Sequence, residues 1–177
     1  RETMAGLRAF NVGRMARGEA PVRIGIGLHY GRLRLGIVGE VQRRQGDIFA
    51  DAVNVASRIE GLTKTFGSAV IVSEAFLANL ADADRALPQR RPLGGVQVKG
   101  RREAVVLHEL FEFDAPDLVA HKQATRDAFA VAQRHFDAQR YAEAATVLEA
   151  VLGAHAGDAA ARHLHGEASV RLDRQQR

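Results

Sequence analysis

Cysteine and tryptophan are absent from this chain of 177 residues, and proline occurs only four times. Without cysteine the chain can form neither a disulfide nor a thiolate metal site, and this composition fits a reducing cytosol. No apolar run approaches the ~18 residues that a membrane-spanning helix needs. Neither a signal peptide nor a transit peptide is apparent. We therefore expect a cytoplasmic protein with no membrane segment in this chain.

Aromatic residues make up only 6% of the chain, which is too few for a platform that stacks nucleic-acid bases. The net charge of +4 is either a solvated basic surface or a field that attracts a polyphosphate. No G-x-x-x-x-G-K-[ST] loop occurs. Gly25, Gly27 and Gly31 miss the dinucleotide spacing because the third glycine comes one residue late and a strand-like run follows it. Nucleic-acid binding, a P-loop and a Rossmann site are thus not predicted.

One segment, D-I-F-A-D-A-V-N-V-A-S-R-I-E, is more informative than the rest of the chain. Asn54 and Arg58 are four residues apart, so on a helix they project from one face. Val53, Ala56 and Ile59 fall on a different, apolar stripe that can pack on a sheet. The polar face is therefore expected to be free to meet a ligand.

The side chains on that face suit a nucleotide. Arg58 offers a planar fork of donors for phosphate oxygens, and Asn54 can bond a sugar or orient a ring. Asp47, one loop earlier, is a carboxylate that could accept from an exocyclic amine. For any one of these residues alone, a solvated polar position on an amphipathic helix is the competing interpretation.

The whole segment resembles the signature helix of the class III adenylate and guanylate cyclases, which reads V-N-x-A-x-R and an acidic residue after a short apolar-Gly turn. One departure is Ala50, where the family usually has Gly. Residues 22–39 are similar to the family's R-I-G-I-H-x-G strand, turn and strand, and residues 68–74 to its next strand and helix start. Residues 92–100 resemble its L-G-x-x-x-x-K-G hairpin. Four matches in the family's order make the resemblance specific.

The resemblance implies a lyase that converts ATP to 3′,5′-cyclic AMP and pyrophosphate in intracellular signalling. Asn54 would hold the ribose, and Arg58 would stabilise charge on the phosphoryl oxygens. Asp47 would accept from the adenine amino group. Lys99 would meet the terminal phosphates, a solvated hairpin lysine being the alternative. The family acts as a dimer with sites at the subunit interface, so a homodimer is expected.

The family's cofactor is a pair of Mg²⁺ or Mn²⁺ ions, held by two aspartates on earlier strands. Neither the F-x-D-I-x-G-F-T-like segment nor the G-D-x hairpin that carries them occurs in this sequence, and a purine-contacting lysine is also missing. We therefore predict no metal ligand in this chain. It is expected to be the C-terminal part of a complete cyclase. The alternatives are a catalytically incomplete module with a regulatory or protein-interaction role, and a non-enzymatic repeat scaffold.

The resemblance and the hydrophobic pattern predict an α+β fold, a partial ferredoxin-like cyclase domain over residues 1–113. The expected helices are 3–17, 51–64 and 74–80. The expected strands are a pair at 22–30 and 32–38, one at 69–72, and two near 95–99 and 104–111.

Residues 117–177 change to alanine-rich helix and resemble a tetratricopeptide repeat, a second one beginning at Asp158. A helical hairpin without special function is the alternative. His163 and His165 diverge on a helix, so they predict no metal site. We expect this segment to be a regulatory or partner-binding appendage that binds a protein.

Overall fold

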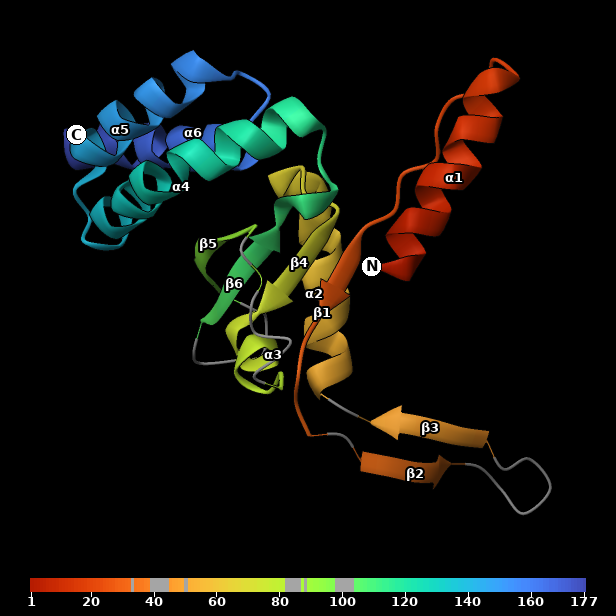
Figure 1. Cartoon of the computed structure of the whole chain (residues 1–177). Helices are drawn as coiled ribbons and strands as arrows, with labels where there is room; N and C mark the ends of the chain where they lie inside the picture. The colour runs from red at the N-terminus through yellow and green to blue at the C-terminus, as the bar shows by residue number, and fades with distance from the viewer. Residues whose placement is uncertain (33, 39–44, 50, 82–86, 88, 98–103) are drawn as a thin grey trace.

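A computed structural model describes the chain except residues 33, 39–44, 50, 82–86, 88 and 98–103, with residues 34–38 and 45–49 described by their backbone alone (Figure 1). It is a mixed α+β structure. Its helices are α1 (Glu2–Ala16), α2 (Asp51–Phe66), α3 (Glu74–Ala78), α4 (Pro116–Asp137), α5 (Tyr141–Ala154) and α6 (Ala159–Gln175), with a 3-10 turn at Phe111–Phe113. Its strands are β1 (Ile26–Leu28), β2 (Arg34–Val38), β3 (Gln45–Phe49), β4 (Val70–Ser73), β5 (Arg90–Val96) and β6 (Val105–Leu110).

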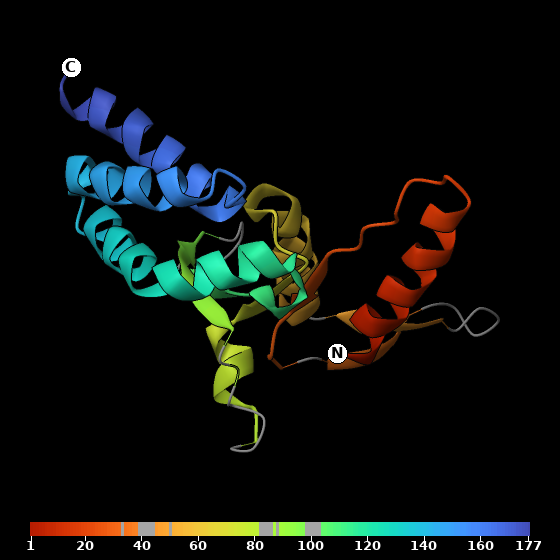
Figure 2. The same cartoon turned by 45° about the horizontal axis from the view of Figure 1, so that its top comes forward.

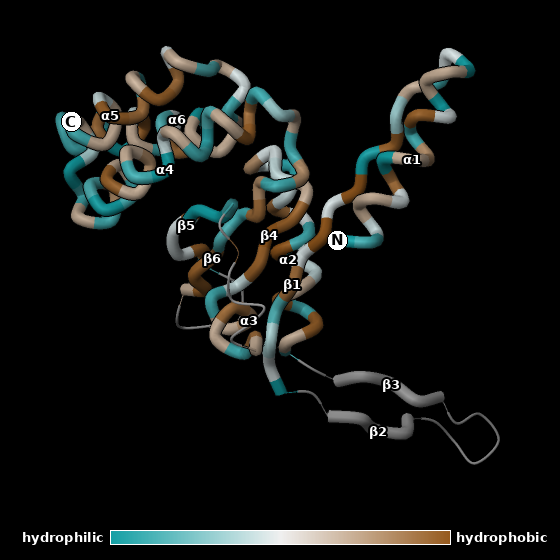
Figure 3. Tube along the Cα trace, viewed as in Figure 1, coloured by the Kyte–Doolittle hydropathy of each residue, from teal (hydrophilic) through white to brown (hydrophobic). Residues whose placement is uncertain are grey.

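The main sheet has the strand order β1-β4-β6-β5, with β1 parallel to β4 and the other pairs antiparallel. The parallel pair is possible because α2 lies between β1 and β4 in the chain and carries it back across the sheet. Strands β2 and β3 form a separate antiparallel ribbon that projects from the body of the molecule (Figure 1). Strands β1 and β4 of the main sheet are hydrophobic along most of their length (Figure 3).

The expected pairing of residues 22–30 with 32–38 is therefore wrong, since β1 pairs with β4 and β2 pairs with β3. An apolar run predicts a strand but carries no information on its partner. Strand β3 was not among the expected strands. Strand β5 also begins earlier than expected, at Arg90.

Each face of the main sheet has its own hydrophobic core, because successive side chains of a strand point to opposite faces. Ile71 of β4 belongs to the core that α2 and the C-terminal helices cover, whereas Val70 and Val72 belong to the core of α1 and α3. Figure 2 shows α4, α5 and α6 stacked as one layer, well away from α1. Among the described helices, none combines the length and the apolarity that crossing a membrane requires.

The segment after residue 116 shares its core with the sheet. Phe129 of α4, Leu148 of α5 and Leu164 of α6 lie in one cluster with Leu93 and Leu107 of the sheet. Alanines let the helices approach closely, and five of them are fully buried: Ala132, Ala144, Ala160, Ala161 and Ala168. Helix α4 begins between the expected segments 1–113 and 117–177, and one core includes residues from both.

Candidate functional site

Helix α2 carries the two predicted residues that face solvent together. Asn54 and Arg58 are both exposed, whereas Val55 and Ile59 are fully buried against the sheet. The expected apolar stripe was wrong in one position, because Val53 is 49% exposed. The buried face of α2 is instead spaced as Val55, Ile59, Thr63 and Phe66. Because residues 53 and 55 are both valine, the sequence alone does not show which of them is buried. Tertiary packing decides it.

Glycines of the first strand region let α2 lie directly on the sheet. A Cβ at Gly27 would stand 2.3 Å from the backbone nitrogen of Glu60, and one at Gly25 would stand 2.1 Å from Oγ1 of Thr63. A Cβ at Gly31 would meet that of Ala52 at 2.8 Å, near the N-terminus of α2. One face of α2 thus packs directly on these glycines, while the polar face of α2 points toward solvent.

The structure gives less information on the other two predicted residues, Asp47 and Lys99. Asp47 lies on the backbone of β3, in register with Gly36 and close in sequence to the start of α2. Lys99 lies outside the described residues, as does Ala50. The structure therefore brings Asn54 and Arg58 onto one helix face, with Asp47 on the strand that precedes it.

A cavity of about 460 Å³ lies elsewhere, between α1 and the second face of the sheet. Its lining is mainly apolar and includes Met4, Leu28 and Phe76, but neither Asn54 nor Arg58. Such a wall offers little to a polyphosphate, so the polar face of α2 is the better candidate for a nucleotide.

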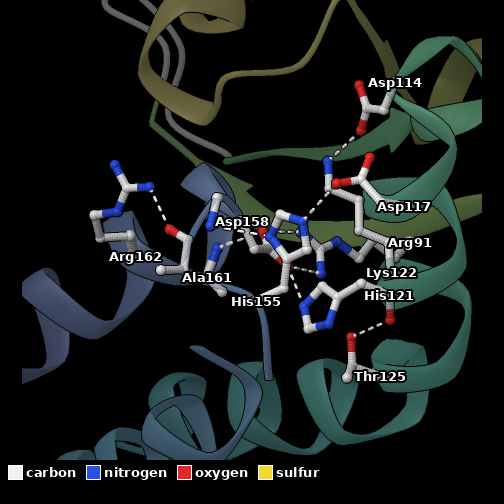
Figure 4. A network of polar contacts seen from close by, with 12 residues as sticks. Arg91, Asp114, Asp117, His121, Lys122, Thr125, His155, Asp158, Ala161 and Arg162 are labelled. Atoms are coloured by element: carbon white, nitrogen blue, oxygen red, sulfur yellow. Dashed lines mark hydrogen bonds and ion pairs between the residues drawn. The ribbon is translucent and has the colours of Figure 1, made fainter. Parts of the chain in front are cut away.

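A cluster of buried charges was not predicted from the sequence (Figure 4). Arg91 of β5 bonds Glu109 of β6 through Nε and holds Asp158 with both terminal nitrogens, Nη1 lying 2.7 Å from Oδ2. The Nζ of Lys122 lies 2.7 Å from Glu109 Oε2 and 2.7 Å from Asp114 Oδ2. A signal existed in β6, because Glu109 continues the inward alternation of V-V-L-H-E-L and so required a buried cation.

Arg91, Asp158 and Asp114 have shifted pKa values in this cluster. Burial acts to lower the pKa of Arg91, but the charges of Glu109 and Asp158 outweigh it and raise that pKa. Burial acts to raise the pKa of Asp158, yet the hydrogen bonds and charge of Arg91 bring that pKa below its ordinary value. Burial raises the pKa of Asp114 despite Lys122. Arg91 and Asp158 therefore form a charged pair over the ordinary pH range.

Comparison with protein-family models matches residues 5–110 to the adenylate and guanylate cyclase catalytic domain. The chain belongs to this family. The match includes α2 and the described strands β1 to β6, so the expected class III cyclase domain is confirmed.

Named relatives of this cyclase-family chain are adenylate cyclases. It is 38% identical over 104 residues to adenylate cyclase 1 of Rhizobium meliloti (strain 1021), covering 59% of this chain and 15% of that protein. It is 39% identical over 89 residues to an adenylate cyclase of Anabaena cylindrica, covering 50% of this chain and 18% of that protein. The chain thus spans less than a fifth of either relative's length. A solved bacterial light-regulated adenylyl cyclase matches at 26% identity and a TM-score of 0.43, covering 57% of this chain and 29% of that one.

Cyclases of this family generally use divalent metal ions. Within the described part of this cyclase-family chain, no three His, Cys, Asp or Glu side chains form a group that could hold a metal ion.

Proposed function

We propose that this chain is part of an adenylate cyclase that converts ATP to 3′,5′-cyclic AMP and pyrophosphate. The observation that carries the proposal is the arrangement of α2, which presents Asn54 and Arg58 to solvent while its other face is packed on a glycine-bearing strand. Membership of the cyclase family and the two bacterial relatives named adenylate cyclase support it.

Arg58 is assigned to the phosphoryl group of the substrate, and Asn54 is assigned to its ribose. In this reaction the 3′-hydroxyl of ATP loses its proton to solvent, and its oxygen forms a bond to the α-phosphorus as the bond to pyrophosphate breaks. Charge develops on the phosphoryl oxygens. Arg58 stabilises that charge because a guanidinium presents its hydrogen-bond donors in a plane that matches phosphoryl oxygens. Asn54 holds the ribose, so that the 3′-oxygen lies in line with the breaking bond.

Substrate binding is assigned to Asp47 and Lys99. Asp47 accepts from the adenine amino group, and Lys99 meets the terminal phosphates. Both assignments rest on the family motifs that these residues match. The cofactor, Mg²⁺ or Mn²⁺, is proposed from the family resemblance alone.

The proposal also covers the domains, the assembly and the C-terminal helices. We propose a partial ferredoxin-like domain over residues 1–113 and a tetratricopeptide-like segment over residues 117–177. The cyclase part acts as a homodimer in the cytoplasm, and the C-terminal helices bind a protein partner. The alanine-lined contacts among α4, α5 and α6 support the repeat-like interpretation.

A second candidate function is a catalytically incomplete cyclase-like module that serves in regulation or protein interaction. It is favoured by the lack of a metal-holding group among the residues described. The test is production of cyclic AMP by the purified full-length protein with ATP and Mg²⁺ or Mn²⁺. Activity that requires Arg58 supports the cyclase, whereas an inactive but folded protein supports the second candidate.

A further inference from the structure

The buried charge cluster connects two strands of the sheet to the start of α6. Arg91 is fully buried on β5, and so are its partners Glu109 on β6 and Asp158 before α6. The Cζ of Arg91 also lies 4.1 Å from the centre of the Phe129 ring of α4. A bidentate pair between arginine and a carboxylate has one favoured orientation, so it specifies geometry as well as attraction.

Besides its hydrogen bonds with Arg91, Asp158 also caps a helix. Its Oδ1 accepts a hydrogen bond of 3.1 Å from the backbone nitrogen of Ala161, which caps the N-terminus of α6. The carboxylate that Arg91 holds therefore also begins the helix. Strand β5 and the first turn of α6 are thus bonded to the same carboxylate.

Helix α6 in turn contacts the C-terminal end of α2. The rings of Phe66 and His163 meet edge to face, with centroids 5.1 Å apart. Gly67 follows α2 with a φ of +60°, and a Cβ there would stand 2.5 Å from the Cβ of Ala159. Helix α2 is thus held at its end by α6 and along its length by the first strand region.

Arg58 lies eight residues before Phe66 on the same continuous helix, which is about 12 Å along its axis. A helix of this length moves nearly as a rigid body, so a shift at its end changes where Arg58 and Asn54 point. Displacements near 1 Å are enough to slow a reaction that depends on in-line geometry by about 10²-fold.

We propose that Arg91, Asp158 and His163 are positioning residues, which hold α2 in place through α6 and so aim Asn54 and Arg58 at the nucleotide. This inference rests on the proposed cyclase function. It makes the C-terminal helices part of what determines turnover, although none of the three residues touches the substrate.

The first test compares two histidines of α6 in the full-length protein. His163 contacts α2, whereas His165 lies 3.5 Å from Glu149 of α5 and serves as the matched control. His163→Ala is expected to lower kcat roughly 10- to 100-fold with KM for ATP nearly unchanged. His165→Ala is expected to leave both constants as they are. Equal effects of the two substitutions, or a change in KM alone, would overturn the proposal.

The second test measures the position of α2 relative to α6 and does not depend on enzymatic activity. This chain has no cysteine, so spin labels can be placed at the exposed positions Lys64 on α2 and Glu167 on α6 through Lys64→Cys and Glu167→Cys. Asp158→Asn retains a capping side chain but loses the charge that Arg91 holds. We expect it to shift or broaden the distance between the labels, as His163→Ala does, while His165→Ala does not.

The two readouts separate the failure of this inference from the failure of the proposed function. A protein that makes no cyclic AMP, but whose distance responds as expected, refutes the cyclase and leaves the link between α6 and α2 standing. An unchanged distance in Asp158→Asn and His163→Ala refutes the positioning role, whatever their turnover.

Discussion

Gly27 lies so close to helix α2 that a Cβ atom on it would stand 2.3 Å from the backbone nitrogen of Glu60. The same atom would stand 2.6 Å from the carbonyl oxygen of Ala56. Both neighbours are backbone atoms, so no side chain can rotate away to make room. The helix that carries Asn54 and Arg58 can therefore sit at this height above the sheet only because residue 27 is glycine.

Gly27→Ala is expected to lower the free energy of unfolding by about 1–3 kcal/mol, since the added methyl group must push α2 off the strand. Gly61→Ala is the matched control, because Gly61 lies within α2 and a Cβ there meets no atom within 4 Å. That control should raise stability by roughly 0.5–1 kcal/mol through helix propensity. Urea unfolding of both variants measures the difference, and a neutral Gly27→Ala would contradict the close packing.

Arg58→Ala is expected to lower kcat of the full-length protein by about 10²–10³ while KM for ATP changes little, because its donors act on charge that develops in the transition state. Lys64→Ala, at an exposed position of the same helix, should leave both constants unchanged. Steady-state kinetics with ATP provides the measurement. Proportionate losses of binding and turnover would count against the assigned role.

ATP is expected to be preferred over GTP, because the Asp47 carboxylate accepts from the adenine amino group but faces an acceptor, O6, on guanine. An unsatisfied polar contact of this kind costs about 1–3 kcal/mol, so the ratio of kcat/KM should be roughly 10- to 100-fold. Asp47→Asn should reduce the ratio, since an amide can also donate. An enzyme that uses GTP as readily as ATP refutes the Asp47 assignment.

Stability is expected to fall as the pH is lowered from about 7 toward 5. Burial lowers the pKa of His121, although Asp158 acts to raise it while His155 and Arg91 act to lower it. Burial likewise lowers the pKa of His108, against the opposing effect of Glu74. The unfolded chain binds more protons than the folded chain between these lowered values and the ordinary 6.5, so acid favours unfolding in that window.

The double variant His108→Gln/His121→Gln should show a shallower loss of stability over the same range, because both shifted imidazoles are removed. Thermal or urea unfolding at several pH values checks this slope. The raised pKa of Asp114 has the opposite sign, and it is common to both proteins. An identical slope in the variant and the parent protein would remove the histidines from the explanation.

The local sequence pattern was sufficient to predict most of the helices and strands. Helical spacing predicted the helices now seen as α1 and α2 to within about two residues, because side-chain periodicity is a property of each segment. The same spacing predicted that Asn54 and Arg58 share a solvent-facing side of α2. The motifs around them also led to the cyclase family, which the match over residues 5–110 confirms.

Pairing and burial were decided only by the tertiary structure. The partner of β1 depends on where α2 returns the chain, and Val55 rather than Val53 is buried because it faces the core that α2 shares with the sheet and the C-terminal helices. Arg91, Glu109 and Asp158 are far apart in sequence, and neither Arg91 nor Asp158 alone differs from a surface charge. They could become a buried cluster only when β5, β6 and α6 met, because a charge is stable away from water only beside its partners.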